Sequence, residues 1–328
     1  MKVVCVGAHI FDVLGRPVTE IPPGQGRLAL EEIKVTAAGT AGGTAVDLAK
    51  LGAEVTSFGA VGDDTAGRVL KMLLTEHGVD ERLAIKPGLA TPSTILPIRP
   101  NGERPSLHAA GAMDALTAAD IDWELVAEAD VLHIGGPDAL GDFTVSVLPE
   151  LLRFANDHGT ATTMDLLRTS VRPELIEILR PCWQHTHYLV PNDDQIRAIT
   201  GIEDLHLAAE KMRAHGVGTV LVTRGGEGSL LVGEELTEIP AFRVPVVDTT
   251  GCGDAYTAGF IAGLCQDWDL PSAARLGTAA SALVAQGLGS DAGIVDLAST
   301  LGFWSERQAE LGGAAPPPPT SSGRARRQ

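Results

Sequence analysis

The sequence predicts an α/β fold in which a parallel β-sheet is covered by helices on both faces. Short runs of β-branched and other apolar residues alternate along the chain with amphipathic stretches of helical length, and this alternation is typical of βαβ units. Residues 15–34 and 91–108 interrupt the pattern. Both segments are strand-like, with alternating polar and apolar positions, and neither contains a helical stretch. We therefore expect a main sheet, with a smaller sheet beside it.

The expected strands of the main sheet are short apolar runs bounded by turn residues. They are Val3–Val6, Val55–Phe58, Val131–Ile134, Thr160–Met164, Tyr188–Val190, Val220–Val222 and Leu230–Val232. The helices between them have apolar residues at helical spacing. They are Ala45–Leu51, Gly67–His77, Val145–His158, Pro173–Leu179, Asp193–Thr200 and Leu205–His215. Further on, Phe242–Val247 is β-like and precedes an expected helix, Ala255–Leu264, which is followed by an Ala-rich helix, Ala279–Ala285.

The two interrupting segments are expected to pair with each other. The second contains Ile95–Ile98 followed by Asn101-Gly102, and Asn-Gly between strand residues favours a hairpin turn. Such a small sheet would cover the carboxyl edge of the parallel strands, where open α/β sheets bind their ligands. The alternative is two surface loops.

Composition and charge exclude several classes of protein. The 328 residues are 44% hydrophobic and 20% charged, as is usual for a globular chain. A formal charge of −17 repels phosphate backbones, so we expect no nucleic-acid partner. Four cysteines without CxxC spacing indicate a reduced, cytoplasmic protein with no zinc site. No run reaches about 18 uncharged apolar residues, so we expect no membrane partner. The N-terminus fits a buried strand better than a signal peptide.

The C-terminal end differs from the rest of the chain. From Gly312 the sequence is GGAAPPPPTSSGRARRQ, with four consecutive prolines and three arginines without an acid. A segment without apolar periodicity cannot bury a core, so we expect residues 312–328 to form a disordered tail. Residues 1–311 are expected to form the folded part.

A glycine-rich turn is the sharpest chemical feature. Residues 247–260 read VDTTGCGDAYTAGF, and an expected strand there meets two glycines and then a helix. The backbone N–H groups of Gly251, Cys252 and Gly253 would lie at a helix N-terminus, which binds anions and stabilises developing negative charge. Asp254 could cap the helix or take a proton from a hydroxyl held beside a phosphate. The chain contains no GxxxxGK[ST] loop.

This turn resembles the C-terminal signature of the ribokinase-like (PfkB) carbohydrate kinases, DTxGAGDxFxxG, with Cys252 and Tyr256 in place of the usual Ala and Phe. Other segments resemble family motifs in the same order, over about residues 3 to 300. They are Gly59–Gly67 (GxVGxDxxG), Gly111–Leu116 (GAN-x-x-L), Leu189–Asn192 (the PN segment) and Val222–Gly228 (TxGxxG). The resemblance implies a ribokinase-like parallel-sheet sandwich with a small β-sheet lid from about 15–35 and 91–110, and a kinase that uses ATP and Mg²⁺.

The resemblance also implies roles for individual residues. Asp254 would be the catalytic base that deprotonates a sugar hydroxyl for attack on the γ-phosphate of ATP, and Gly251, Cys252 and Gly253 would form the anion hole. Other expected residues lie along the nucleotide or on its adenine side. They are Asn192, Thr223, Arg224, Gly225, Gly228, Gly287 and Gly289.

The expected substrate site departs from the family pattern. Asp12, at the end of the first strand, would hold substrate hydroxyls, and Gly39 would let the substrate approach the backbone. Gly43 stands where relatives have a sugar-binding Asn, and the loss of that Asn puts a plain ribose or fructose kinase in doubt. Met113 replaces the Asn of the GAN segment, so part of the expected polar pocket would be apolar. Arg168 belongs to a segment that resembles DxNxR, and its guanidinium suits a phosphate or a substrate carboxylate.

Metal binding is expected at two places. In the NxxE motif of the family, this chain has Gln195 in place of Glu, so the metal-linked role falls to Asn192 and to Asp194, which could order Mg²⁺ through water. Asp194 could also simply favour the first turn of a helix. Asp248 and Thr250 match the positions where ribokinase relatives hold a monovalent cation, so K⁺ activation is one outcome that the resemblance allows.

Three functions remain open. The first is phosphorylation of a sugar or sugar-like small molecule. The second is an adenosine-type nucleoside kinase, because the apolar Met113 and the glycine-rich segment 38–43 would suit a flat base. The third is a catalytically silent sugar-binding or regulatory relative, which only Gln195 favours. The lids of this family often pair between subunits, so a homodimer through the lid is plausible. Cys252 is a candidate redox-sensitive thiol, because a helix N-terminus can lower a thiol pKa.

Overall fold

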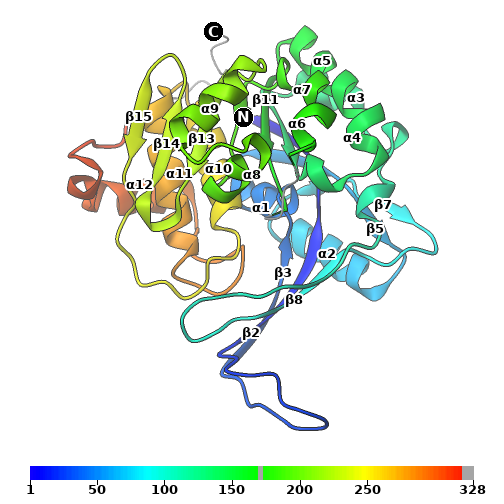
Figure 1. The fold of residues 1–328 in the computed structure, drawn as a ribbon. Helices are drawn as coiled ribbons and strands as arrows, with labels where there is room; N and C mark the ends of the chain where they lie inside the picture. Colours follow the sequence, from blue (N-terminus) through cyan, green and yellow to red (C-terminus); the bar gives the residue numbers. More distant parts are fainter. Residues whose placement is uncertain (169–172, 320–328) are drawn as a thin grey trace.

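A computed structural model describes residues 1–168 and 173–319. Within them, nine strands form one sheet in the order β15-β14-β13-β12-β11-β10-β1-β4-β6. The strands are β1 (Lys2–Gly7), β4 (Glu54–Phe58), β6 (Asp80–Glu81), β10 (Val131–Gly135), β11 (Ala161–Asp165), β12 (Tyr188–Leu189), β13 (Thr219–Thr223), β14 (Ser229–Val232) and β15 (Leu236–Ile239). The strands from β6 to β13 are parallel, whereas β14 and β15 continue the sheet antiparallel. The predicted α/β class is therefore confirmed (Figure 1).

The central strand β1 explains why the sheet is covered on both faces. Val3 and Cys5 belong to one apolar core, and Val4 and Val6 to the other, because alternate residues of a strand point to opposite faces. Helices on the first face are α1 (Gly42–Lys50), α2 (Thr65–Glu76), α10 (Cys252–Leu264), α11 (Leu270–Val284) and α12 (Leu297–Glu306). Those on the second face are α3 (Trp123–Glu128), α4 (Asp142–Ser146), α5 (Leu148–His158), α6 (Leu175–Ile178), α7 (Arg180–Trp183), α8 (Asp193–Thr200) and α9 (Leu205–Ala214).

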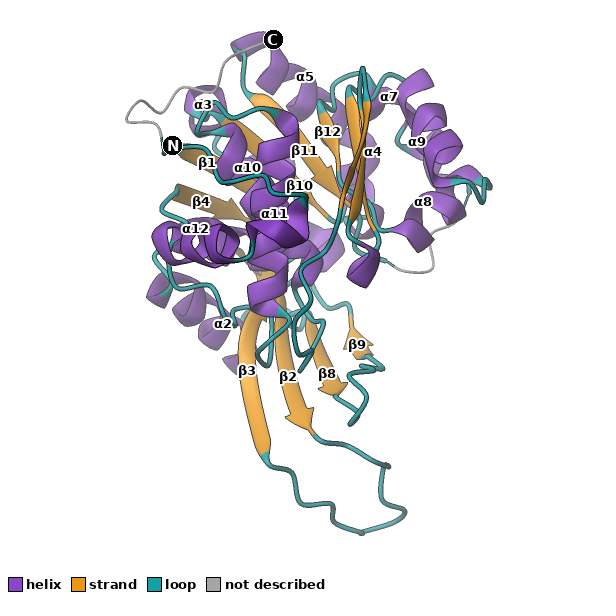
Figure 2. Cartoon of the chain, turned by 90° about the vertical axis from the view of Figure 1, so that its left-hand side faces the viewer, coloured by secondary structure: helices purple, strands orange, loops and turns teal. Residues whose placement is uncertain are grey.

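A second sheet, which we call the lid, projects from the carboxyl edge of the main sheet (Figure 2). Its strands are β2 (Ile10–Arg16), β3 (Glu32–Ala38), β8 (Ser93–Pro97) and β9 (Leu107–Ala109), in the order β3-β2-β8-β9. The expected small sheet is thus present, but its strands start nearer to the main sheet than predicted, and residues 17–31 are a connection rather than a strand. Asp12 correspondingly lies in β2 and not at the end of the first strand. A separate parallel pair is formed by β5 (Ala60–Gly62) and β7 (Ala84–Lys86).

Three other elements differ from the sequence prediction. The helix expected over Val145–His158 is divided into α4 and α5, because Pro149 in the first turn of α5 cannot continue a helix from the preceding residues. Phe242–Val247 forms no strand. It instead passes the end of α11, where the Val247 N–H donates to the Ala285 carbonyl at 2.8 Å. The helix expected from Pro173 is limited to the single turn of α6.

The predicted C-terminal tail begins with residues that contact the folded part. The Trp304 indole N–H donates to the Ala314 carbonyl at 2.8 Å, and the Trp268 indole N–H donates to the Pro318 carbonyl at 3.3 Å. The rest of the tail, beyond Pro319, lies outside the described residues. Across the described chain, no helix combines the length and the apolar character that crossing a bilayer requires.

Candidate active site

A cavity of about 640 Å³ lies between the lid and the carboxyl edge of the main sheet. Its walls come from β2 and β8, the connection between β8 and β9, the loop after β11, the start of α8 and the turn before α10. The ionisable side chains that line it are Asp12, Arg104, His108, Asp165, Arg168, Asp193, Asp194 and Asp254. Ligand binding at this edge is what the parallel topology predicts.

Asp254 lies in the first turn of α10 and faces the start of α1. A Cβ atom built on Gly43 would be 2.6 Å from Asp254 Oδ2. Gly43 does not line the cavity. It leaves room for the Asp254 carboxyl group, and an Asn side chain at this position would displace that group. Burial raises the pKa of Asp254 to about 7; the Arg104 guanidinium lowers it in part, and the Asp12 carboxylate raises it further. A carboxyl that titrates near neutrality suits a general base.

The turn before α10 offers two free backbone donors. Gly251 is left-handed, with φ of 80°, and α10 begins at Cys252. Among the described residues, the N–H groups of Gly251 and Gly253 meet no acceptor, whereas the Cys252 N–H donates to the Thr249 carbonyl at 3.3 Å. The expected anion hole thus has two open donors beside Asp254 and a third that is already used within the turn.

Hydrogen bonds to the carboxylate of Asp248, which is fully buried, hold the turn before α10 in place. Its Oδ1 accepts from the Thr250 N–H at 3.0 Å and the Thr250 hydroxyl at 2.8 Å, and its Oδ2 accepts from the Gly289 N–H at 3.0 Å. Gly287 and Gly289, which were expected on the adenine side, line neither cavity described here. Gly289 instead belongs to the segment that supports the turn.

The lid contributes a row of polar side chains to the cavity. In the strand register Asp12 pairs with Thr94, and Thr94 pairs with His108, so all three point to the same side. The His108 ring nitrogen Nδ1 is 3.0 Å from the Thr94 hydroxyl. Asp12 Oδ1 is buried without a hydrogen-bond partner among the described residues, and burial raises the pKa of Asp12 to about 7 despite the Thr94 hydroxyl and Arg104. A buried, unpartnered oxygen in this wall suits a ligand hydroxyl.

Two residues of the cavity were missed by the sequence analysis as site residues. Arg104, from the β8–β9 connection, donates through Nε to the Thr249 hydroxyl at 3.1 Å, next to the anion hole. Asp165 ends β11 and is buried in the cavity wall; burial, together with the Asp254 charge, raises its pKa well above the ordinary value. Its place at the carboxyl end of a buried parallel strand was a usable signal, whereas the position of Arg104 in an irregular loop was not.

The other expected substrate residues lie at the cavity. Gly39, Met113 and Arg168 all line it. The Asp138 carboxylate fixes the loop after β11 by accepting from the Leu167 and Arg168 N–H groups at 2.9 and 2.8 Å. This loop therefore has a defined backbone up to Arg168, beyond which residues 169–172 are outside the described chain.

A second cavity, of about 630 Å³, adjoins the first. Thr223, Gly225 and Gly253 line both cavities, and Gly228 lines the second. The two cavities therefore meet at the turn before α10, which contains Gly253. Arg224 lines neither cavity, because its guanidinium turns to Glu238, 3.3 Å away.

Cys252 lines the second cavity. Burial raises the pKa of the Cys252 thiol to about 12. Desolvation here outweighs the helix N-terminus that was expected to lower this pKa, so the thiol stays protonated near neutral pH and the reason for expecting redox sensitivity is lost.

Gln195 explains the departure at the NxxE motif. Its Oε1 accepts from the Asn192 N–H, and the Asn192 Oδ1 accepts from the Gln195 N–H, both at 2.8 Å. Its Nε2 donates to the carbonyls of Leu166 at 2.9 Å and Arg168 at 3.3 Å. A Glu has no N–H for these two carbonyls, so the amide joins α8 to the loop after β11. Gln195 is therefore a structural link between α8 and this loop.

The two carboxylates next to Gln195 in the sequence differ in their ion pairing and in their exposure to solvent. Asp193 pairs with Arg197 at 2.6 Å, whereas the Asp194 side chain is 79% exposed and 3.8 Å from the same arginine. Among the described residues, no group of three or more His, Cys, Asp or Glu is arranged to hold a metal ion.

The sequence pattern described as pfkB family carbohydrate kinase matches residues 1–296. Fructokinase-1 of Oryza sativa subsp. japonica is 26% identical over 238 residues, 70% of this chain and 74% of that protein. Adenosine kinase from Sinorhizobium meliloti is 26% identical, with a TM-score of 0.79 over 94% of this chain and 99% of that one. A putative ribokinase II from E. coli, in complex with ATP and Mg²⁺, shares the fold at 20% identity, with a TM-score of 0.80 over 93% and 99% of the two chains.

Proposed function

Since the chain belongs to the pfkB family of carbohydrate kinases, we propose that it transfers the γ-phosphoryl group of ATP to a hydroxyl of a sugar or sugar-like small molecule, with Asp254 as the catalytic base. One observation carries this proposal. Asp254 lies beside two free backbone donors, those of Gly251 and Gly253, at the point where the two cavities meet.

The proposed step needs few groups. An acceptor hydroxyl in the first cavity gives its proton to the Asp254 carboxylate, and its oxygen forms a bond to the γ-phosphorus. The bond from that phosphorus to the bridging oxygen breaks, and ADP remains in the second cavity. The Gly251 and Gly253 N–H groups receive the charge on the transferring phosphoryl oxygens. Asp12, with its unpartnered oxygen, accepts a hydrogen bond from another substrate hydroxyl.

Arg104 supplies positive charge close to Asp12, Asp254 and the proposed anion hole. Its guanidinium lowers the pKa of both Asp12 and Asp254 and is held at the anion hole through Thr249. A cavity wall with several carboxyl groups repels phosphate, and an arginine at the transferring group offsets that repulsion.

ATP and Mg²⁺ are the ligands of the E. coli structure, and we propose the same pair here. Mg²⁺ neutralises charge on the β- and γ-phosphates when it is bound. It commonly takes only one or two protein carboxylates together with phosphates and water. Asp194, exposed at the cavity, is the residue that would hold it through water, because the neighbouring Asp193 is paired with Arg197.

The acceptor is either a sugar or a nucleoside. The carboxyl groups of Asp12 and Asp165 in the cavity wall favour a substrate with several hydroxyls. The likeness to the adenosine kinase from S. meliloti and the apolar Met113 favour a nucleoside. The alternative of a catalytically silent relative rested only on Gln195. The hydrogen bonds from the Gln195 amide to two backbone carbonyls give that residue a structural reason. Four free cysteines, three of them buried, support the proposed cytoplasmic location.

The test is ADP formation from Mg-ATP with ketoses, aldoses, sugar acids, sugar phosphates and nucleosides as acceptors, with the phosphorylated product identified by its mass. Turnover fastest with a sugar supports the proposal, and turnover fastest with adenosine supports the nucleoside alternative. A folded protein that binds ATP and turns over none of these classes would overturn both.

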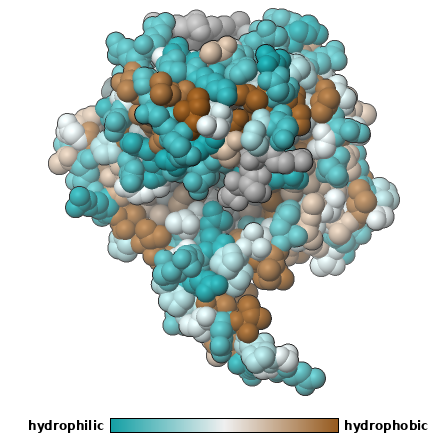
Figure 3. All heavy atoms as spheres, viewed as in Figure 1, coloured by the Kyte–Doolittle hydropathy of each residue, from teal (hydrophilic) through white to brown (hydrophobic). Residues whose placement is uncertain are grey.

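The outer face of the lid, opposite the cavity, has a row of exposed apolar side chains. Val35, Ile95 and Leu107 are 39%, 56% and 60% exposed, and the register aligns them across the lid through Val13 on β2. Figure 3 shows apolar atoms on the projecting lid. A row of exposed apolar residues opposite the polar row that faces the cavity favours burial against a second copy of this chain.

We therefore expect a homodimer in solution and a monomer for Ile95→Lys, measured by light scattering during size-exclusion chromatography. Val145→Lys is the matched control, because Val145 is 65% exposed on α4, away from the lid. A monomeric wild-type protein, or a dimer that Ile95→Lys leaves intact, would rule out the lid interface.

A further inference from the structure

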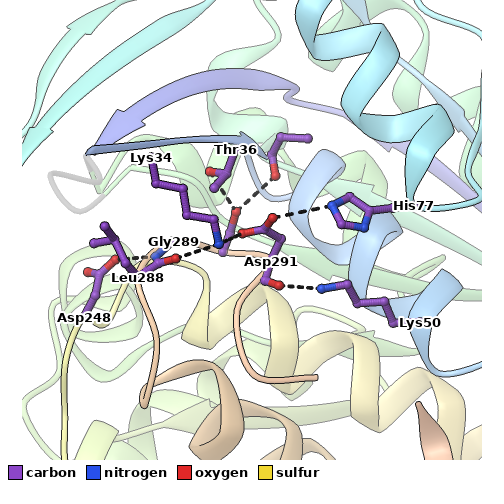
Figure 4. A network of polar contacts seen from close by, with 10 residues as sticks. Lys34, Thr36, Lys50, His77, Asp248, Leu288, Gly289 and Asp291 are labelled. Carbon is purple, nitrogen blue, oxygen red and sulfur yellow. Dashed lines mark hydrogen bonds and ion pairs between the residues drawn. The ribbon is translucent and has the colours of Figure 1, made fainter. Parts of the chain in front are cut away.

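The Lys34 ammonium group contacts the segment that supports the turn before α10. Lys34 is on the lid strand β3, and its Nζ donates to the Leu288 carbonyl at 2.9 Å and pairs with Asp291 Oδ1 at 2.6 Å (Figure 4). It thereby bridges the backbone and a side chain of residues 288–291, which we call the support turn.

The support turn is fixed by several further contacts. Asp291 Oδ2 is 3.4 Å from Nε2 of His77, which directly follows α2, and the Asp291 carbonyl accepts from Lys50 Nζ on α1. The Ser290 hydroxyl donates to the Ala37 carbonyl of β3 at 3.0 Å. Lys34 hence acts within a network that draws the support turn toward α1, α2 and the lid.

The anion hole rests on this turn. The Gly289 N–H donates to Asp248, which in turn holds Thr250. A Cβ atom on Gly251 would be only 2.4 Å from the Ser290 Cα, so the backbones of Gly251 and Ser290 are in close contact. A shift of the support turn would therefore move the Gly251 N–H group.

The groups expected to bind a monovalent cation are mostly engaged with donors from the protein itself. The resemblance to ribokinases places such a cation at Asp248 and Thr250, but both oxygens of the Asp248 carboxylate already accept hydrogen bonds from Thr250 and Gly289. Of the nearby carbonyls, that of Leu288 is taken by the Lys34 ammonium. Protein donors thus take three of the roughly four acceptor sites of the Asp248 carboxylate and one of the two lone pairs of the Leu288 carbonyl, which leaves a cation few oxygens to bind.

We propose that Lys34 is a positioning residue whose ammonium group does the work of a monovalent cation, so that phosphoryl transfer in this chain does not require K⁺. The inference rests on the proposed function for its kinetic effect. The ammonium fixes the Leu288 carbonyl and Asp291, and the support turn then fixes Gly251. Because Lys34 belongs to the lid, the same contact joins the lid to the anion hole.

The test compares the wild-type protein with Lys34→Met in potassium chloride and in tetramethylammonium chloride of equal ionic strength. Wild-type kcat should be the same in both salts. Lys34→Met should lose about 10- to 100-fold in kcat in tetramethylammonium, the scale of a misplaced catalytic group, and K⁺ should restore part of it by entering the space that the ammonium leaves. Lys71→Met is the matched control, because Lys71 has a similar exposure, 29% against 31%, and also forms an ion pair.

A second readout does not depend on turnover. K⁺ should raise the melting temperature of Lys34→Met relative to tetramethylammonium, and should not do so for wild type or Lys71→Met. If no acceptor is phosphorylated, this measurement still decides the role of Lys34. K⁺ activation of the wild type, or a Lys34→Met protein with wild-type kcat and melting temperature in both salts, would overturn the proposal.

Discussion

Asp254→Asn is expected to reduce kcat by about 10²- to 10⁴-fold, the usual contribution of a general base. Asn has nearly the shape of Asp and keeps the space above Gly43 filled, but it cannot accept the hydroxyl proton. ATP should bind at least as tightly as in the wild type, because the second cavity does not include Asp254 and the change removes a carboxylate that repels the γ-phosphate. Steady-state ADP formation measures the loss of turnover, and calorimetry measures nucleotide affinity.

Asp142→Asn is the matched control for this variant. Asp142 is likewise an aspartate in the first turn of a helix, but it is exposed on α4, away from both cavities, so its kcat should be that of the wild type. An Asp254→Asn protein that keeps most of the wild-type turnover would mean that another group takes the proton.

The same variant has a pH-dependent effect on stability. Asp254 has a folded-state pKa of about 7, raised by burial above the ordinary 3.8. Its contribution to the free energy of unfolding is therefore complete below about pH 3.8 and is lost as the pH rises through 7. The Asn variant cannot ionise, so it should escape this loss and melt at a higher temperature than the wild type above pH 7.

Gly251→Ala is expected to damage both stability and turnover. Gly251 has φ of 80°, and the added Cβ would lie 2.4 Å from the Ser290 Cα. The left-handed backbone alone costs a non-glycine residue about 1–3 kcal/mol, and the close contact would add to this by moving the support turn. Loss of a preorganised donor at a developing charge typically costs about 10²- to 10³-fold in kcat. Urea denaturation and steady-state kinetics measure the two effects.

Gly302→Ala is the control for this second variant. Gly302 lies in α12, and a Cβ atom there meets nothing within 4 Å, so Ala should leave kcat unchanged and stabilise the helix by about 0.5–1 kcal/mol. If Gly251→Ala matched the wild type in both stability and kcat, the anion hole would not depend on the backbone geometry described here.

The features that sequence predicted well are local ones. The strands of the main sheet are short apolar runs whose burial depends mainly on their own residues, and the turn from Asp248 to Asp254 is a contiguous motif. The lid was predicted from the absence of helical periodicity, but its strand ends were misplaced, because the register of β2 with β3 and β8 depends on pairing between distant segments.

The features that sequence could not give depend on contacts across the fold. The amide of Gln195 reaches the carbonyls of Leu166 and Arg168, which precede it by 29 and 27 residues, so the substitution looked like a lost metal ligand. Lys34 reaches Leu288, 254 residues away. The pKa of the Cys252 thiol is set by its burial and not by its position at the start of a helix. In each case the chemistry is set by neighbours that no local pattern contains.

The pH dependence of kcat/KM, measured with the acceptor that the panel identifies, tests the role of Asp254 most directly. The base must be ionised, and its pKa is about 7, so kcat/KM should rise with pH up to about 7 and then level off. Asp12→Asn removes a negative charge that raises the pKa of Asp254, so the midpoint should move to lower pH even though substrate binding weakens. A profile that is flat between about pH 5 and 9, or a midpoint that Asp12→Asn leaves in place, would contradict the assignment of Asp254 as the base.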